Sequence, residues 1–436
     1  MARWAILGCS GGSTSTCAAG RSSPSPRSTR CARCIENTST SSRRPSGLAA
    51  ASRRGSATPT TTSGALDSTT APGRGSPGRD GAPSSRTSST RWRVLERPVA
   101  AAPPVSVLFP ARNAAATVDD ALGSVLEQTD PDFEVIAVDD ASSDDTLDRL
   151  RAWAARDRRV RVLARNGARG DLVAALERAR AAARGAYLLR MDADDFAHPE
   201  RLAACRPLLD ADPALAAVSC LVRSFPGARV RPGRRRYDAW LNGLRTHEAM
   251  ARERFVESPV AHPSVLLRAC AVAAVGGYRR FAGPEDYDLW LRLFAAGARF
   301  AKVPRLLLFW REREGRLSRR CPRYGPAGFA RARADAFARL LAGRPAALLG
   351  SGSAGRRMAR ELLARGVRVS FFVDRDPRKV GRSPYGVPVL GFEEALARRR
   401  GEVVLTAVNA WGARAAARRG LREAGLREGR DFFLGG

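Results

Sequence analysis

Between residues 104 and 320, short continuous hydrophobic runs alternate with hydrophobic residues at helical spacing. The continuous runs, which predict buried strands, lie at 105–109, 135–138, 161–163 and 186–189. Hydrophobic residues at helical spacing follow the first three runs, as in the set Val118, Ala121, Leu122, Val125 and Leu126. Ser142 or Ser143 is expected to cap the second helix. This β-α-β-α order predicts a parallel, doubly wound sheet.

A second pattern of the same kind occupies residues 345–436. Predicted strands lie at 346–349, 369–373 and 403–405, and a G-x-G-x-x-G turn follows the first of them. The pattern is typical of a Rossmann-like unit, because a strand, a glycine turn, a helix, a second strand and an acid follow one another. The glycines of such a unit let a phosphate approach a helix N-terminus. The candidates for a second nucleotide site are therefore Gly350, Gly352, Gly355 and Asp374. A structural unit without a ligand is the alternative.

The remaining segments set the domain organisation. Residues 1–98 are rich in Ser, Thr, Arg, Pro and Gly without hydrophobic periodicity, which predicts disorder. A stretch that does not belong to the native protein is the alternative. We expect one domain at 99–322, a helical linker at 323–344 and a smaller domain at 345–436.

Composition and charge restrict the classes of function. The formal charge is +31, but Lys302 and Lys379 are the only lysines among 74 basic residues, which indicates arginine-rich codon usage rather than nucleic-acid binding. Such a surface could still attract anionic nucleotides or acidic lipid headgroups.

No run approaches the roughly 20 apolar residues that span a bilayer. Eight scattered cysteines fit a reducing compartment. We expect a cytoplasmic protein, with peripheral association at the inner face of the membrane left open.

The most informative feature is an acidic group directly after the fourth predicted strand. Asp192, Asp194 and Asp195 follow the run 186–189 after Arg190 and Met191. Ligands of open α/β sheets bind at the carboxyl ends of the strands. Carboxylates that are crowded there repel one another unless a cation joins them, and such oxygen-rich sites suit Mg²⁺ or Mn²⁺ with a substrate phosphate. The pattern predicts a divalent cation that holds a diphosphate.

Taken in order, the motifs resemble glycosyltransferase family 2, the inverting nucleotide-sugar transferases with the GT-A fold. The resemblance covers roughly half of the chain. The stretches that carry it are 107–113, 138–146, 190–195, 199–202, 262–263, 276–278 and 283–290. The expected fold class is α/β, with a mixed GT-A sheet flanked by helices and a smaller Rossmann-like domain.

The resemblance implies a pocket for the sugar-nucleotide donor at the ends of the first two strands. Asp139 and Asp140 would accept the N3–H of a uracil or thymine ring, and Pro110 and Asn113 would line the same pocket. Arg169 would neutralise the diphosphate. The residues alone leave other readings open. The two acids could form a helix cap or an Asx turn, Asn113 could be a turn residue, and Arg169 could be a solvated surface arginine.

The resemblance also implies the catalytic groups. Asp194 would coordinate the cation, and Asp192 would touch the ribose or the ion. Inversion needs a base on the opposite face of the sugar. Asp286 would be that base, with Glu285 positioning it or the acceptor. Acids in the first turn of a helix are the alternative reading of this pair.

Three departures from the family pattern modify these expectations. Arg313 stands where the family often has a histidine near the metal, so it either binds the diphosphate itself or weakens metal affinity. Glu177 replaces a frequent asparagine. The Gln-x-x-Arg-Trp block of processive synthases is missing, which predicts a single addition. We expect an enzyme that uses a UDP- or dTDP-linked sugar and a glycan or lipid-linked acceptor. A silent sugar-nucleotide sensor and a nucleic-acid binder are the alternatives.

Overall fold

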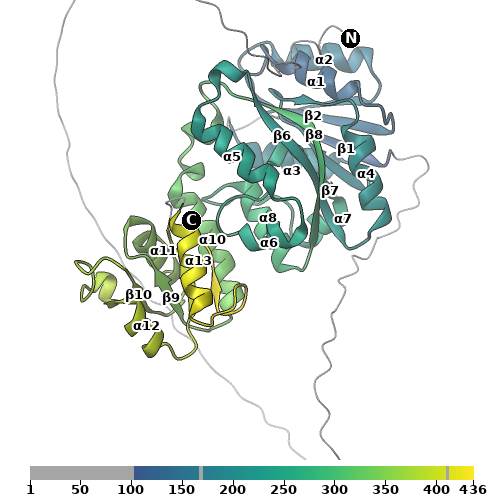
Figure 1. Cartoon of the computed structure of the whole chain (residues 1–436). Helices are drawn as coiled ribbons and strands as arrows, with labels where there is room; N and C mark the ends of the chain where they lie inside the picture. The colour runs from purple at the N-terminus through teal and green to yellow at the C-terminus, as the bar shows by residue number, and fades with distance from the viewer. Residues whose placement is uncertain (1–102, 166–169, 409–411) are drawn as a thin grey trace, which may run out of the picture. The chain divides into compact units, whose positions relative to one another are not determined.

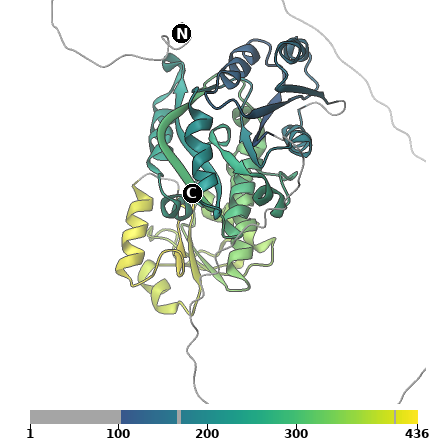
Figure 2. The same ribbon diagram turned by 90° about the vertical axis from the view of Figure 1, so that its right-hand side faces the viewer.

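The computed structural model describes residues 103–165, 170–408 and 412–436. All of them belong to one compact unit, Pro83–Gly436. Two predictions lie outside the described residues. They are the disorder of the segment 1–98 and the position of Arg169 at the diphosphate. Figure 1 and Figure 2 show a large sheet with helices on both faces and a smaller sheet near the C-terminus.

The large sheet has eight strands in the order β3-β2-β1-β4-β7-β6-β8-β5. The first four positions, β3 to β4, are parallel as the sequence predicted, whereas β7 runs antiparallel to both of its neighbours. The sheet is therefore mixed. Its strands are β1 (Val105–Ala111), β2 (Phe133–Asp139), β3 (Val160–Ala164), β4 (Tyr187–Arg190), β5 (Phe196–Ala197), β6 (Leu215–Phe225), β7 (Leu266–Arg268) and β8 (Arg299–Arg311).

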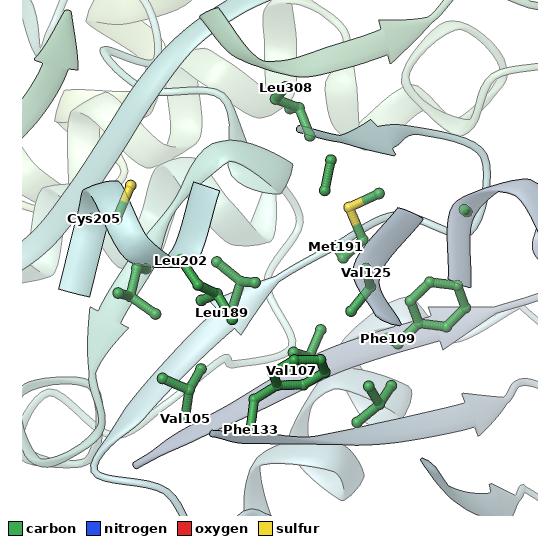
Figure 3. Packing of buried hydrophobic residues seen from close by; sticks show 14 of the residues in the cluster. Val105, Val107, Phe109, Val125, Phe133, Leu189, Met191, Leu202, Cys205 and Leu308 are labelled. Atoms are coloured by element: carbon green, nitrogen blue, oxygen red, sulfur yellow. The ribbon is translucent and has the colours of Figure 1, made fainter. Parts of the chain in front are cut away.

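Both faces of this sheet are covered, which explains why its central strands are hydrophobic throughout. Val107 and Phe109 of β1 pack on one face, where Figure 3 shows them with Met191 and Leu202, while Leu108 packs on the other. The helices up to the end of the large sheet are α1 (Val118–Leu126), α2 (Thr146–Arg156), α3 (Leu172–Ala182), α4 (Arg201–Ala211), α5 (Pro232–Gly243), α6 (His247–Glu253), α7 (Ala269–Ala274) and α8 (Glu285–Ala295).

The smaller sheet has five parallel strands in the order β11-β10-β9-β12-β13. The three strands expected from the sequence are β9, β10 and β12. A side chain at Gly355 would meet the carbonyl oxygen of Gly350 at 1.7 Å, so the turn requires glycine there. The strands are β9 (Ala346–Leu349), β10 (Val369–Val373), β11 (Val389–Leu390), β12 (Val403–Thr406) and β13 (Phe432–Phe433), and the helices beside them are α11 (Ser353–Leu363), α12 (Phe392–Arg398) and α13 (Ala413–Glu423).

Helix α10 (Pro326–Leu341) lies within the expected linker and follows the short helix α9 (Leu317–Arg320). Phe337 of α10 belongs to one hydrophobic cluster with Tyr287 of α8 and Leu348 of β9. The segment is therefore part of the core, although the exact domain boundaries stay predictions. Among the described residues, no helix has both the length and the hydrophobicity that crossing a membrane requires. The expected cytoplasmic location stays a prediction too.

Candidate active site

The carboxylates expected to bind a cation follow β4 at the edge where β1 also ends. The backbone N–H of Met191 donates to the carbonyl of Leu108, which holds the segment after β4 against β1. Carboxylate oxygens of Asp192, Asp194 and Asp195 lie within 4.8 Å of one another. Because three negative charges this close repel strongly, the cluster must be neutralised by cations or protons.

Each of the three acids has a different environment. Asp192 accepts a hydrogen bond from Arg190 at 2.6 Å, and Asp194 accepts one from Arg313 at 2.6 Å. Asp195 is fully buried and accepts from the backbone N–H of residue 311, but its Oδ2 has no partner within the described residues. Burial, together with the charges of Asp194 and Asp192, raises the pKa of Asp195 well above its ordinary value.

This cluster fits a divalent cation. The three acids can each offer an oxygen to one ion, and carboxylates are the ligands that Mg²⁺ and Mn²⁺ prefer. The unpartnered Oδ2 of Asp195 is the kind of buried acceptor that an ion or its bound water satisfies. Arg313 already holds one oxygen of Asp194, so it competes for part of that site.

The second expected acidic pair begins α8. Glu285 is 2% exposed, and its Oε2 accepts a hydrogen bond from the Tyr324 hydroxyl at 2.6 Å. Its Oε1 lies 3.8 Å from Nδ1 of His262, whose pKa is lowered well below its usual value by burial and by the charge of Arg190. Asp286 carries a pKa raised to about 8, because burial and the neighbouring Glu285 disfavour its charged form.

The two acidic groups share one cleft of about 340 Å³. Asp192 and Asp194 lie on its walls together with Glu285 and Asp286. The helix dipole of α8 points its positive end toward this cleft, where it favours negative charge. The cleft therefore joins a cation-binding group to an acid whose pKa lies close to neutral pH.

The residues expected at the nucleotide base lie apart from the lining of this cleft, at the carboxyl ends of β1 and β2. Asp139 is 3% exposed, and its Oδ1 has no partner among the described residues, whereas Oδ2 accepts from the N–H of Ser142. Asp140 pairs with Arg165 at 2.6 Å. A buried free acceptor on Asp139 is compatible with a ring N–H donor, but the roles of both acids stay predictions.

Asn113 joins two loops at the same edge. Its backbone is left-handed, with φ of 46°, and its Oδ1 accepts from the N–H of Ser143. The expected serine cap is wrong, because α2 starts later, after Asp145, and Ser142 accepts instead from the N–H of Asn113. Asn113 thus acts here as a turn residue. Pro110 lies inside β1, and a donor-binding role for either residue stays a prediction.

Several residues of the cleft were not identified from the sequence. Arg190 is 1% exposed, and its Nε and Nη1 have no partner among the described residues. The ring of Trp310 lies between Arg234 and Arg316, whose guanidinium carbons are 3.9 and 4.8 Å from its centroid. An arginine inside a buried strand could have signalled Arg190. Nothing in the sequence pattern joins Trp310 to Arg234, because the fold alone brings them together.

Glu177, which replaces a frequent asparagine, has a structural role. It pairs with Arg180 at 2.7 Å and accepts a hydrogen bond from the N–H of Tyr278 at 2.6 Å. Gly276 and Gly277, just before Tyr278, both have positive φ. Glu177 therefore holds the tight turn that leads toward α8, and it is not placed in the cleft lining.

The glycine turn of the smaller sheet is closed by its own acid. Asp374 accepts hydrogen bonds from the N–H and the hydroxyl of Ser351, at 2.9 and 2.6 Å, and Lys379 lies at 3.3 Å. These contacts outweigh the effect of burial and lower the pKa of Asp374 to about 2. Its acceptor positions are thus already used, and a nucleotide site at Gly350, Gly352 and Gly355 stays a prediction.

Comparisons with known proteins agree with this geometry. The family model "Glycosyl transferase family 2" matches residues 106–274. The "Putative glycosyltransferase EpsE" of Bacillus subtilis is 31% identical over 221 residues, which cover 50% of this chain and 76% of EpsE. The "Chondroitin synthase" of Pasteurella multocida is 29% identical over 198 residues, or 45% of this chain and 19% of the synthase.

Among solved structures, S. aureus TarS 1-349 in complex with UDP-GlcNAc is similar over 60% of this chain and 72% of its own, with a TM-score of 0.42 and 17% identity. The match to EpsE extends over most of that relative. The chain spans about a fifth of the chondroitin synthase. On this evidence the chain belongs to glycosyltransferase family 2.

Proposed function

We propose that this chain moves one sugar from a UDP- or dTDP-linked donor to a hydroxyl group of a cell-surface glycan or lipid-linked acceptor, with inversion at the anomeric carbon. The observation that supports the proposal is the shared cleft, whose lining contains Asp192 and Asp194 together with Asp286. A direct displacement needs one group for the departing diphosphate and another for the attacking hydroxyl.

The reaction is a single displacement. The acceptor oxygen forms a bond to the anomeric carbon while the bond from that carbon to the diphosphate oxygen breaks and leaves its electron pair on the diphosphate. The acceptor proton passes to the carboxylate of Asp286. A base whose pKa lies near 8 is matched to this transfer close to neutral pH. Glu285, held by Tyr324, keeps the first turn of α8 in place and raises the pKa of Asp286.

The donor diphosphate lies in this proposal beside Asp192, Asp194 and Arg313. A bound Mg²⁺ or Mn²⁺ supplies Lewis-acid stabilisation of the negative charge on the leaving group. Arg313 adds a fixed positive charge at the same wall. The unpartnered Oδ1 of Asp139 would accept the N3–H of uracil or thymine, which supports a pyrimidine nucleotide.

A glycan acceptor is supported by the relatives. One of them is named as a chondroitin synthase, which makes a glycan, although the chain spans only part of it. Single addition follows from the missing Gln-x-x-Arg-Trp block. The test is a thermal-shift screen of nucleoside diphosphates and their sugars with and without Mn²⁺. UDP or dTDP should stabilise the protein, and EDTA should weaken that effect. No response to any nucleoside diphosphate would overturn the proposal.

A catalytically silent sensor remains the second candidate, because a chain that binds UDP-sugars would pass the same screen. Donor turnover separates the two functions. Release of UDP from a UDP-sugar at a rate that depends on Asp286 supports the enzyme. Tight binding without any turnover, with water or with acceptor oligosaccharides, supports the sensor.

A further inference from the structure

A second cavity, of about 360 Å³, lies next to the catalytic cleft. One side of it is formed by residues of the smaller sheet's helices and loops, among them Ala354 and Met358 of α11 and Ala407 after β12. These elements follow β9 and β12, the central strands from which the chain turns to opposite sides of the sheet. Ligands of parallel sheets bind at such a switch point.

The cavity continues into the cleft. Tyr237, Glu257, Tyr324 and Phe329 line both spaces. Tyr324 is also the residue that bonds Glu285, next to the proposed base. The four acids Asp192, Asp194, Glu285 and Asp286 line the cleft and not the cavity, and Tyr324, at the boundary of the two spaces, contacts Glu285.

The polar lining of the cavity is positively charged. Arg333, Arg357 and Arg414 line it together with one acidic side chain, Glu257, and with Gly436, which lies beside Arg333 and Arg414. Burial raises the pKa of Glu257, and the charges of Arg333 and Arg414 oppose this shift. An excess of guanidinium groups over carboxylates in a cavity creates a potential that attracts an anion.

Arg333 gives independent evidence for a ligand. Its side chain is 6% exposed, and its Nη1 donates to the carbonyls of Phe255 and Val256 at 3.3 Å. Its Nε has no hydrogen-bond partner, and neither Arg333 nor Arg357 forms an ion pair with a described residue. Placing an arginine in a buried position without a carboxylate is costly unless an anionic group completes its contacts.

The rest of the lining favours a sugar chain over a nucleotide. Tyr237, Trp240, Tyr324 and Phe329 supply aromatic surfaces, which suit the apolar faces of sugar rings. Asp374, the acid that would hold a ribose, lies outside this lining and is occupied by Ser351 and Lys379. We infer that the cavity is an acceptor subsite, which binds an anionic glycan segment next to the sugar that receives the transfer. This inference rests on the proposed transferase function.

The test compares two variants of neighbouring arginines on α11 in the full chain. Arg357→Gln removes a charge from the cavity, and Arg356→Gln removes the same charge from an exposed position outside it. Titration calorimetry with UDP and Mn²⁺ present would use three probes. These are a hexuronic-acid tetrasaccharide, an alditol-phosphate oligomer and a neutral glucose tetrasaccharide.

We expect one anionic probe to bind the native protein at least about tenfold more tightly than the neutral one, because hydrogen bonds to charged groups have about this strength. Arg357→Gln should lose about tenfold of that affinity, and Arg356→Gln less than about twofold. The two anionic probes distinguish a carboxylate from a phosphate as the recognised group.

Three results would overturn the inference. The first is equal affinity for neutral and anionic probes, including no binding of either. The second is an equal loss in the two variants, which indicates only the general charge of the surface. The third is UDP or another nucleotide binding in an Arg357-dependent manner. UDP affinity, measured in the same samples, separates this inference from the transferase function. If neither UDP nor an anionic probe binds, the proposed function fails together with the inference.

Discussion

Arg313 donates a hydrogen bond from its Nε to Oδ2 of Asp194 over 2.6 Å, so a fixed cation lies against the acid expected to hold a metal. The arginine occupies the position at which the family often has histidine. Asp194 is 17% exposed in its side chain, and Arg313 is 42% exposed. The pair is therefore partly open to solvent, and in the proposed reaction Arg313 would compete with a bound cation for Asp194.

Arg313→His should strengthen Mn²⁺ binding by about tenfold, because it removes a positive charge that competes for Asp194 and adds a group able to coordinate the ion. Titration of Mn²⁺ followed by electron paramagnetic resonance would measure the affinity. Arg305→His, at an exposed ion pair with Glu200, is the matched control and should leave the affinity unchanged. Unchanged Mn²⁺ binding in Arg313→His would show that Asp194 does not ligate the ion.

Asp286→Asn should lower kcat by about 10²- to 10⁴-fold, since an amide cannot accept the acceptor proton. Its affinity for UDP should stay within about twofold, because the carboxylate is on the acceptor side of the cleft. Initial rates of sugar transfer and UDP titration would give the two numbers. Asp148→Asn, an exposed acid of α2, is the control and should retain full activity. A variant of Asp286 with native turnover would exclude this residue as the base.

The raised pKa of Asp286 predicts an alkaline pH profile. The charged form is the active base, so kcat/KM should rise with pH and level off above about 8. Burial and Glu285 cause the shift, and Asp286→Asn should abolish the rise together with the activity. A profile that stays flat between about pH 6 and about pH 9 would contradict the assignment of Asp286 as the base.

The same shift affects stability. Asp286 binds its proton more tightly in the folded protein than in the unfolded chain, so the folded state holds more protons between the two pKa values. Its contribution to stability is therefore lost progressively as pH rises from about 4 toward 8. Asp286→Asn should raise the melting temperature more at pH 8 than at pH 5, which differential scanning calorimetry would measure. An equal effect at both pH values would refute the buried-carboxyl explanation.

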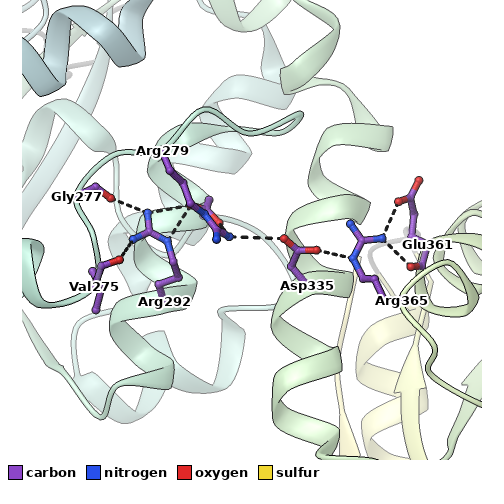
Figure 4. A network of polar contacts seen from close by, with 8 residues as sticks. Val275, Gly277, Arg279, Arg292, Asp335, Glu361 and Arg365 are labelled. Atoms are coloured by element: carbon purple, nitrogen blue, oxygen red, sulfur yellow. Dashed lines mark hydrogen bonds and ion pairs between the residues drawn. The ribbon is translucent and has the colours of Figure 1, made fainter. Parts of the chain in front are cut away.

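Asp288 of the active-site helix α8 contacts two arginines, one of which, Arg292, belongs to the same helix. It is 2% exposed and accepts from Arg279 and Arg292, which Figure 4 shows in a network that continues through Asp335 to Arg365. Asp288→Asn should reduce the free energy of unfolding by about 3 kcal/mol, because it leaves a buried arginine without its charge partner.

Asp335→Asn is the control for this network. Asp335 pairs with the same Arg279 at 3.5 Å but is 22% exposed, so its loss should cost about 1 kcal/mol or less. Urea unfolding followed by tryptophan fluorescence would compare the two variants. Equal losses would mean that burial does not determine the strength of these ion pairs.

The sequence by itself determined most parallel strands of both sheets and the candidate acids. Continuous hydrophobic runs predicted the parallel strands β1, β2, β3 and β4, because residues buried on both faces of a sheet must all be hydrophobic. The acids Asp192, Asp194, Glu285 and Asp286 were singled out by residue type and by the resemblance to the family motifs, and their roles stay predictions. The parallel strands β9, β10 and β12 were predicted by the same reasoning.

Only the tertiary structure decided the surroundings of these acids. The antiparallel β7 and the contacts of Tyr324, Trp310 and Arg313 join residues far apart in the chain, and local periodicity holds no information on such pairs. The pKa of Asp286 and the use of Asp374 by Ser351 depend on burial and on neighbours that the fold brings together. Residue types are local properties of a chain, whereas desolvation and electrostatic coupling arise only after packing.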